Sequence, residues 1–140
     1  MLRAPSHEGA LFFTLGMKNF INVVRKSGPI KTRKQLTVNN GMTDEMGNLT
    51  LWSLMDEMNN VRRERLAALK LDNNWKDQLL NMTVKMYANA ELGNTLTFES
   101  CFVQNDKKSV DLKVYVSKHK KGQPAKRVCK AIYTVSIQRK

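Results

Sequence analysis

Apolar residues recur every three or four positions between Gly47 and Leu69, which places them along one side of a helix. The residues on this side are Leu51, Leu54, Met55, Met58, Val61, Leu66 and Leu69. The opposite side carries Asn59, Asn60, Arg62, Arg63 and Glu64. Either Asn48 or Thr50 can cap the helix, because a short polar side chain accepts a hydrogen bond from a free N–H group of the first turn. The pattern therefore predicts one long amphipathic helix over residues 47–69.

Four later segments alternate apolar and polar residues, which is the period of a strand with one buried face. They cover residues 80–88, 95–102, 110–117 and 129–138. The links contain Gly93, or Gly122 with Pro124, and favour a meander of consecutive strands. Residues 30–38 predict a short first strand, and residues 70–77 a polar connection. A helix and a sheet with one apolar side each bury those sides together, so we expect an α+β domain whose antiparallel sheet wraps the helix.

The first part of the chain differs from the rest. Residues 9–27 predict an additional N-terminal helix, ended by Gly28 and Pro29. This part is also basic, poor in acids and amphipathic, as mitochondrial targeting regions are. We therefore divide the chain into an N-terminal segment, residues 1–29, and a domain, residues 30–140, and expect a mitochondrial location.

The formal net charge is +12, and the positive charge gathers at the two ends of the chain. Residues 118–140 contain no acid. Such ends attract polyanions, namely nucleic acid, anionic lipid or a phosphorylated ligand, although a solvated basic surface explains them equally well. The chain has no apolar run of about 18 residues, so no transmembrane segment is predicted.

Few residues suit metal or redox chemistry. Cys101 and Cys129 are too few for a disulfide framework, which fits a reducing compartment. Together with His7 and His119 they form no metal-binding spacing, and no cofactor or metal is predicted.

A short strand, a long helix and four further strands, over residues 34–138, resemble the hotdog fold of the thioesterase superfamily. In the phenylacetyl-coenzyme A (CoA) thioesterase-like branch, a His-Gly-Gly turn opens the helix and an acid follows nine positions after the His. Here Gly47 stands in place of the His, and Asp56 lies nine positions later. In the 4-hydroxybenzoyl branch an Asp stands three residues before a Gly, which Asp44 and Gly47 match.

The resemblance implies hydrolysis of an acyl-CoA thioester. Asp56 or Asp44 would act as base or nucleophile, although each can also be an ordinary solvated acid. The backbone N–H groups of Gly47, Asn48 and Leu49 would stabilise the oxyanion, helped by the helix dipole.

Other residues affect this interpretation in opposite directions. Leu79 and Leu80 stand where a polar supporting residue is usual, which argues for lost activity. The basic loop with Lys118, Lys120 and Lys121 would hold CoA phosphates, or simply keep a hairpin soluble. The fold usually completes its sheet and site by pairing, so the resemblance also implies a homodimer or a heterodimer with a related hotdog chain.

Three functions stay open from the sequence. The first is a catalytically degenerate hotdog protein that serves as a structural or binding subunit of a larger mitochondrial complex. The second is an active acyl-CoA thioesterase. The third is a basic protein that contacts RNA, mainly through phosphates because the sequence has no paired aromatic motif for base stacking.

Overall fold

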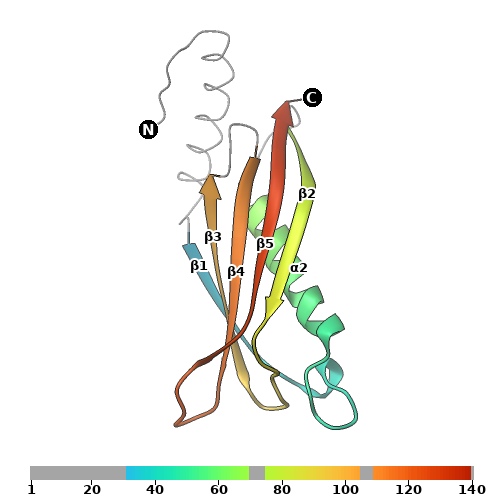
Figure 1. Ribbon diagram of the computed structural model, residues 1–140, viewed down its shortest axis with the longest axis vertical. Coiled ribbons are helices and arrows are strands. Elements are labelled where there is room, and N and C mark those ends of the chain that lie inside the picture. The colour runs from blue at the N-terminus through green and yellow to red at the C-terminus, as the bar shows by residue number, and fades with distance from the viewer. Residues whose placement is uncertain (1–30, 70–74, 105–108, 140) are drawn as a thin grey trace.

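The computed structural model describes residues 31–69, 75–104 and 109–139 (Figure 1). The elements, in chain order, are β1 (Lys31–Thr37), the 3-10 helix η1 (Asn40–Met42), α2 (Leu51–Ala67), β2 (Trp75–Met86), β3 (Thr95–Gln104), β4 (Ser109–His119) and β5 (Lys126–Arg139). The predicted N-terminal helix over residues 9–27 lies outside the described residues, and so does the boundary at residue 29.

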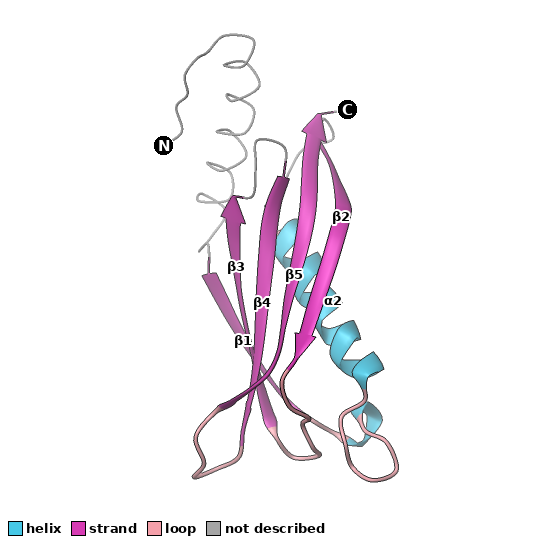
Figure 2. Ribbon diagram, in the orientation of Figure 1, coloured by secondary structure: helices cyan, strands magenta, loops and turns pink. Residues whose placement is uncertain are grey.

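The five strands form one antiparallel sheet in the order β1-β3-β4-β5-β2. Helix α2 lies along one face of this sheet (Figures 1 and 2). The predicted meander is confirmed for β3, β4 and β5, but β2 pairs with β5 instead of β3. The reason is the connection over residues 87–94, which is longer than a hairpin turn and carries the chain across the end of the sheet.

The core lies between α2 and the inner face of the sheet. Every second residue of β4 is buried, as its alternation predicts, and β3 and β5 contribute in the same way. The fully buried side chains of the strands include Leu96, Phe98, Leu112, Val114, Val116 and Tyr133. From the helix, Leu54, Met58 and Val61 pack against them, which confirms most of the predicted apolar side.

Helix α2 is shorter than predicted at its start. Thr50 is the cap, and its side-chain oxygen accepts a hydrogen bond from the backbone N–H of Ser53. The residues before it form a turn and not helix. Leu51, predicted to be buried, is exposed because the first helical turn lies beside the loops at the end of the sheet (Figure 1).

Two arginines occupy the core side of α2, where the sequence indicated apolar residues only. Arg65 is 9% exposed, and its guanidinium carbon lies 4.9 Å from the centroid of the Phe102 ring. Burial lowers the pKa of Arg65 from its ordinary value. Arg62, assigned from the sequence to the solvent side, lies 5.5 Å from the centroid of the Tyr133 ring. Long aliphatic stems let such side chains cover apolar surface, which a pattern of apolar residues does not reveal.

The connection after α2 is also shorter than the predicted residues 70–77. Strand β2 begins at Trp75, and Lys76 already pairs with Gln138 of β5. The alternation misses this start because β2 is an edge strand: backbone hydrogen bonds extend it where its side chains, such as Lys76 and Asp77, are exposed and polar.

Because the thiol of Cys129 is buried, the free energy of unfolding is expected to fall at alkaline pH. Its sulfur lies 3.6 Å from the sulfur of Met58, and burial raises its pKa to about 11. In the unfolded chain a cysteine titrates near about 8.5. As pH rises from about 8.5 towards about 11, the unfolded chain loses this proton first, so the free energy of unfolding falls.

Urea denaturation at a series of pH values tests this prediction, with Cys129→Ala as the control. Subtracting the free energy of unfolding of Cys129→Ala from that of wild type at each pH removes the contribution that tyrosines and lysines make to both proteins. We expect wild type to lose stability more steeply than Cys129→Ala over this range. Equal pH slopes for the two proteins would contradict the prediction.

Candidate functional site

A tight turn precedes α2, and Asp44 organises it. One carboxylate oxygen of Asp44, Oδ1, accepts hydrogen bonds from the backbone N–H groups of Met46 (2.9 Å) and Asn48 (3.0 Å). The backbone N–H of Asp44 donates to the carbonyl of Asn48, and that of Gly47 donates to the carbonyl of Asp44. Gly47 has a φ of +81°, a conformation that glycine adopts readily. The turn therefore fixes the Asp44 carboxylate in one orientation at an exposed position.

The three N–H groups predicted to stabilise an oxyanion already donate within the chain. Gly47 donates to the Asp44 carbonyl, Asn48 to the Asp44 carboxylate, and Leu49 to the Ala90 carbonyl at 2.8 Å. An oxyanion site there stays a prediction, and it would require these bonds to break. Helix geometry instead leaves the first-turn N–H groups of Leu51 and Trp52 without an acceptor in the helix.

Asp56 lies in the second turn of α2, on the side away from the sheet. Its side chain is exposed, whereas Leu54 and Met58, two positions before and after it, are buried. Trp52 stands four residues earlier, which is the same side of a helix, and is 83% exposed. Trp52 therefore does not belong to the core of the single chain. The carboxylate and the indole thus share one open surface at the start of α2.

The loop over residues 87–94 joins this region to the β4–β5 hairpin. Leu92 donates its N–H to the Gly47 carbonyl at 2.8 Å, and Glu91 pairs with Asn48 in an isolated β-bridge. The buried side chain of Asn94 accepts a hydrogen bond from the N–H of Glu91 at 2.8 Å. The loop is therefore fixed to the helix start by backbone bonds.

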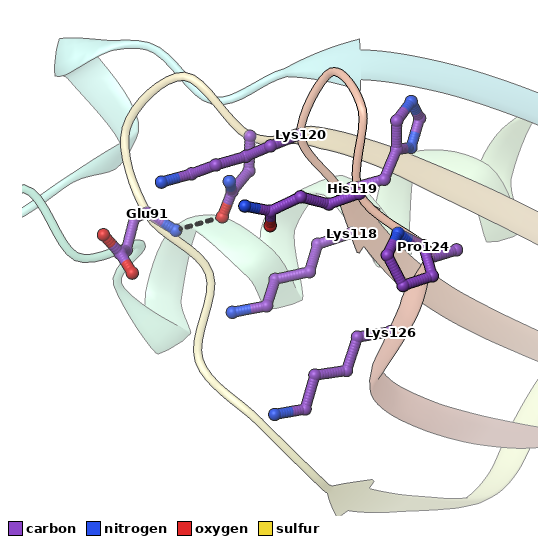
Figure 3. A pocket seen from close by; sticks show the side chains of 9 residues that line it. Glu91, Lys118, His119, Lys120, Pro124 and Lys126 are labelled. Atoms are coloured by element: carbon purple, nitrogen blue, oxygen red, sulfur yellow. Dashed lines mark hydrogen bonds between the residues drawn. The ribbon is translucent and has the colours of Figure 1, made fainter.

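The other side of the same loop forms a basic pocket with the hairpin, with a volume of about 460 Å³ (Figure 3). Its lining residues are Glu91, Asn94, Lys118, His119, Lys120, Gln123, Pro124, Ala125 and Lys126. Lys118 and Lys126 are directly opposite partners on β4 and β5, where like charges repel. Lys118 donates to the carbonyl of Asn89. The pocket therefore concentrates positive charge with one carboxylate, that of Glu91, in its lining.

The predicted basic loop is found in part in this pocket. Lys118 and Lys120 line it, whereas Lys121 is exposed and does not belong to the lining. Lys126 was missed, although it follows the hairpin turn and pairs with Lys118 across it. Strand register supplies that neighbour, and sequence spacing alone does not. In Figure 3 the ring of His119 points away from the lysine ammonium groups.

The described part of the chain contains neither a candidate metal site nor a membrane-spanning helix. No group of three or more His, Cys, Asp or Glu side chains within residues 31–69, 75–104 and 109–139 could hold a metal ion. None of the helices in these ranges has the length and apolar character needed to cross a bilayer.

The chain is similar to solved thioesterase structures. It superimposes on 4-hydroxybenzoyl CoA thioesterase from Pseudomonas sp. strain CBS-3 with a TM-score of 0.68 and 14% identity, over 80% of this chain and 93% of the other. A 1,4-dihydroxy-2-naphthoyl-CoA thioesterase from Synechocystis gives 0.63 and 13%, over 78% and 82%. A hypothetical thioesterase from Streptococcus pneumoniae TIGR4, solved with coenzyme A, gives 0.64 and 16%, over 80% and 84%. The sequence matches no protein-family model and no curated protein.

These similarities cover most of both chains, and they establish the hotdog fold that the sequence predicted. The antiparallel sheet of five strands with one helix is confirmed with it. At such low identity the similarities show the fold alone. The fold by itself therefore does not specify the function of this chain.

Proposed function

We propose that this hotdog-fold chain binds acyl-CoA thioesters and, as half of a dimer, hydrolyses them at the start of α2. One observation carries the proposal: the loop over residues 87–94 is hydrogen-bonded to the helix start on one side and lines the basic pocket on the other. Figure 1 shows the helix start and the β4–β5 hairpin at the same end of the molecule. A ligand with phosphates at one end and a reactive carbonyl at the other matches this arrangement.

The basic pocket suits the nucleotide end of CoA. Lys118, Lys120 and Lys126 offer ammonium groups, which form charge-assisted hydrogen bonds with phosphate oxygens. Lys118 and Lys126 repel each other in the free protein, so a bound polyanion would relieve a cost that the fold otherwise bears. Three of the solved neighbours are named for CoA thioesters or were solved with CoA, which agrees with this ligand class.

The helix start suits the thioester end. The free N–H groups of Leu51 and Trp52 can donate to the carbonyl oxygen as it gains negative charge. Asp56 then removes a proton from a water whose oxygen attacks the carbonyl carbon. When the carbon–sulfur bond breaks, the protonated Asp56 returns its proton to the CoA sulfur, and the products are a carboxylic acid and free CoA. Asp44 is the competing carboxylate, already oriented by its turn.

A second copy of the chain would complete this site. The single chain exposes large apolar side chains around the helix start and along edge strand β2, namely Met46, Leu51, Trp52, Leu79, Leu80, Met86 and Tyr87. Exposed apolar surface of this extent marks an interaction site. Pairing β2 with β2 of a second copy would cover the edge, and the partner chain would exclude water from the surface that Trp52 and Asp56 share.

A binding subunit without catalysis is the second candidate, and two observations favour it. The N–H groups of Gly47, Asn48 and Leu49 are already used within the chain. Leu79 and Leu80 are apolar where the fold usually supplies a polar partner. Such a subunit would bind acyl-CoA and show no turnover. Its place in a mitochondrial assembly is our proposal from the basic, amphipathic residues 1–29.

Hydrolysis of a panel of thioesters separates these two functions. The panel contains acetyl-, hexanoyl-, palmitoyl- and benzoyl-CoA, and release of the acid is measured by chromatography. Turnover above the uncatalysed rate supports the enzyme. Binding of the same ligands by calorimetry without turnover supports the binding subunit. Neither binding nor turnover on the whole panel contradicts both.

The pocket makes a separate prediction about affinity. Replacing Lys118 and Lys126 with Gln should raise the KM for acyl-CoA, or its Kd in the absence of turnover, by about tenfold, because two charge-assisted contacts to phosphate are lost. The same change should leave the KM of the matching N-acetylcysteamine thioester unaltered, since that substrate has no phosphate.

The matched control is Lys85→Gln with Lys130→Gln, a pair of opposite lysines on another face of the sheet. It removes the same charge without touching the pocket, and it should leave the acyl-CoA KM within about twofold, because distant exposed charges are screened by salt. Equal losses in both double variants would show that total charge, not the pocket, sets affinity.

A further inference from the structure

The face of the sheet that points away from α2 carries a cluster of basic residues. Residues whose neighbours along the strand are buried in the core must point to this outer face. Its basic residues are Lys31 and Arg33 of β1, Lys113 of β4, Arg127 and Lys130 of β5, and Lys76 and Lys85 of β2. The described strands add two acids to this face. Glu99 lies between Arg33 of β1 and Tyr115 of β4, and Asp111 accepts a hydrogen bond from Thr134 at 2.7 Å.

Most of the cations of β4, β5 and β2 gather around Tyr115, whose direct partner on β3 is Glu99. We call five of these residues the outer basic patch: Lys85, Lys113, Arg127, Lys130 and Tyr115. Lys130 is the direct partner of Tyr115 on one side and of Lys85 on the other. The guanidinium carbon of Arg127 lies 4.8 Å from the Tyr115 ring centroid, and the ammonium nitrogen of Lys130 lies 5.7 Å from it. The patch thus combines an aromatic ring with cations on adjacent strands.

This arrangement destabilises the fold, and the fold does not require it. Like charges directly opposite each other on antiparallel strands are destabilising, and Lys85 faces Lys130 in this way. An acid at either position would form a favourable pair instead. Places where a sequence breaks such a local rule are typically functional sites. The proposed acyl-CoA site does not use these residues, because they lie on the opposite face from α2.

The charge and the side chains of the patch favour one kind of binding partner over the others. A second copy would bring the same positive charge against it, so back-to-back pairing of two such faces is opposed. A lipid surface would favour large exposed apolar side chains beside the cations, and the ring of Tyr115 is instead flanked by Arg127 and Lys130. Single-stranded nucleic acid offers both complements: phosphates for the cations, and bases that stack on tyrosine rings and on guanidinium planes.

We propose that the outer basic patch binds single-stranded nucleic acid, with Lys85, Lys113 and Lys130 on phosphates and Tyr115 with Arg127 stacking a base. Contacts of this kind read little sequence, so binding is expected to be general and sensitive to salt.

Fluorescence anisotropy of the full-length protein with labelled oligonucleotides tests the proposal. The probes are a mixed-sequence RNA strand, the DNA strand of the same sequence, and the DNA duplex, each over a series of salt concentrations. We expect the single strands to bind tighter than the duplex. Preference for RNA over DNA identifies an RNA ligand, and equal affinity identifies any single strand. Tighter binding to the duplex, or to vesicles of phosphatidylserine, overturns the proposal.

Two sets of variants locate the site. Lys85→Gln with Lys130→Gln should lower the slope of log K against log salt by about 1.4, since each phosphate contact to a single strand contributes about 0.7. Tyr115→Leu should weaken binding about tenfold at unchanged salt slope, because stacking is lost and charge is not, whereas Tyr115→Phe should bind as wild type does.

The control is the pocket pair, Lys118→Gln with Lys126→Gln, which removes the same charge elsewhere. It should leave the salt slope within about 0.5 of the wild-type value, because it removes no contact of the patch. If the pocket pair weakens binding as much as the outer pair, the patch is not the site. Removing the repulsion between Lys85 and Lys130 should not lower thermal stability, so loss of binding would not reflect unfolding.

Discussion

Replacing Asp56 with Asn is expected to lower kcat for acyl-CoA hydrolysis by about 10²- to 10⁴-fold, the range for a lost general base. The reason is that asparagine keeps the size of the side chain and loses its ability to take a proton from water. Asp56 lies on the open side of α2, so the change should leave the free energy of unfolding within about 0.5 kcal/mol of wild type. Steady-state kinetics with the best thioester of the panel measure the effect.

Asp44→Asn is the matched control, because it makes the same chemical change in the tight turn that precedes the helix. The amide oxygen of asparagine can still accept the two hydrogen bonds from Met46 and Asn48, so the turn should keep its shape. We expect Asp44→Asn to retain activity within about threefold, an effect far below that of losing a general base. A collapse of kcat in Asp44→Asn, with Asp56→Asn fully active, would move the catalytic carboxylate to the turn.

The kinetic constants also distinguish a catalytic carboxylate from one that only binds. A residue that acts in the transition state lowers kcat and kcat/KM together, whereas a residue that binds the substrate raises KM at constant kcat. In the proposed function the pocket lysines belong to the second class and Asp56 to the first. If Asp56→Asn changed only KM, its role would be to orient the ligand, and the base would have to be sought elsewhere.

The fold was largely predictable because alternation and helical period both report burial. Leu112, Val114 and Val116 alternate with polar residues in the sequence, and they line the inner face in the structure. The periodicity of apolar residues does not predict the structure where a polar side chain is buried or where a strand is held by backbone pairing alone. Arg65 is buried beside an aromatic ring, and the start of β2 is held by backbone pairing. Neither leaves a signal in a pattern of apolar residues.

The site was less predictable, since it depends on contacts between residues far apart in the chain. The sequence indicated Asp44 as a possible base, but it did not reveal that the carboxylate accepts two backbone hydrogen bonds. It did not reveal either that the loop over residues 87–94 joins the helix start to the basic hairpin. The Lys85–Lys130 pair is likewise visible only once the register of β2 and β5 is known.

The proposed dimer is expected to dissociate when two of the exposed apolar residues assigned to its interface are changed together, by Trp52→Ala and Leu80→Lys. Trp52 is 83% exposed and Leu80 55% exposed in the single chain, so neither change removes a contact of the core. Tryptophan at the centre of an interface typically contributes about 2 kcal/mol or more to association, a factor of about 30 in Kd. A lysine on an edge strand opposes pairing further, because strand-to-strand association would bury its charge.

Sedimentation velocity over a range of concentrations measures the Kd of the dimer, and Val103→Lys, an exposed apolar residue of interior strand β3, is the control. We expect a dimer for wild type and Val103→Lys, and a folded monomer for the double variant. Activity should fall with the monomer fraction and recover at high protein concentration, because the proposed site needs the partner to desolvate Asp56. A monomeric wild type with full activity would show that one chain suffices, and the exposed Trp52 would then face the substrate and not a second subunit.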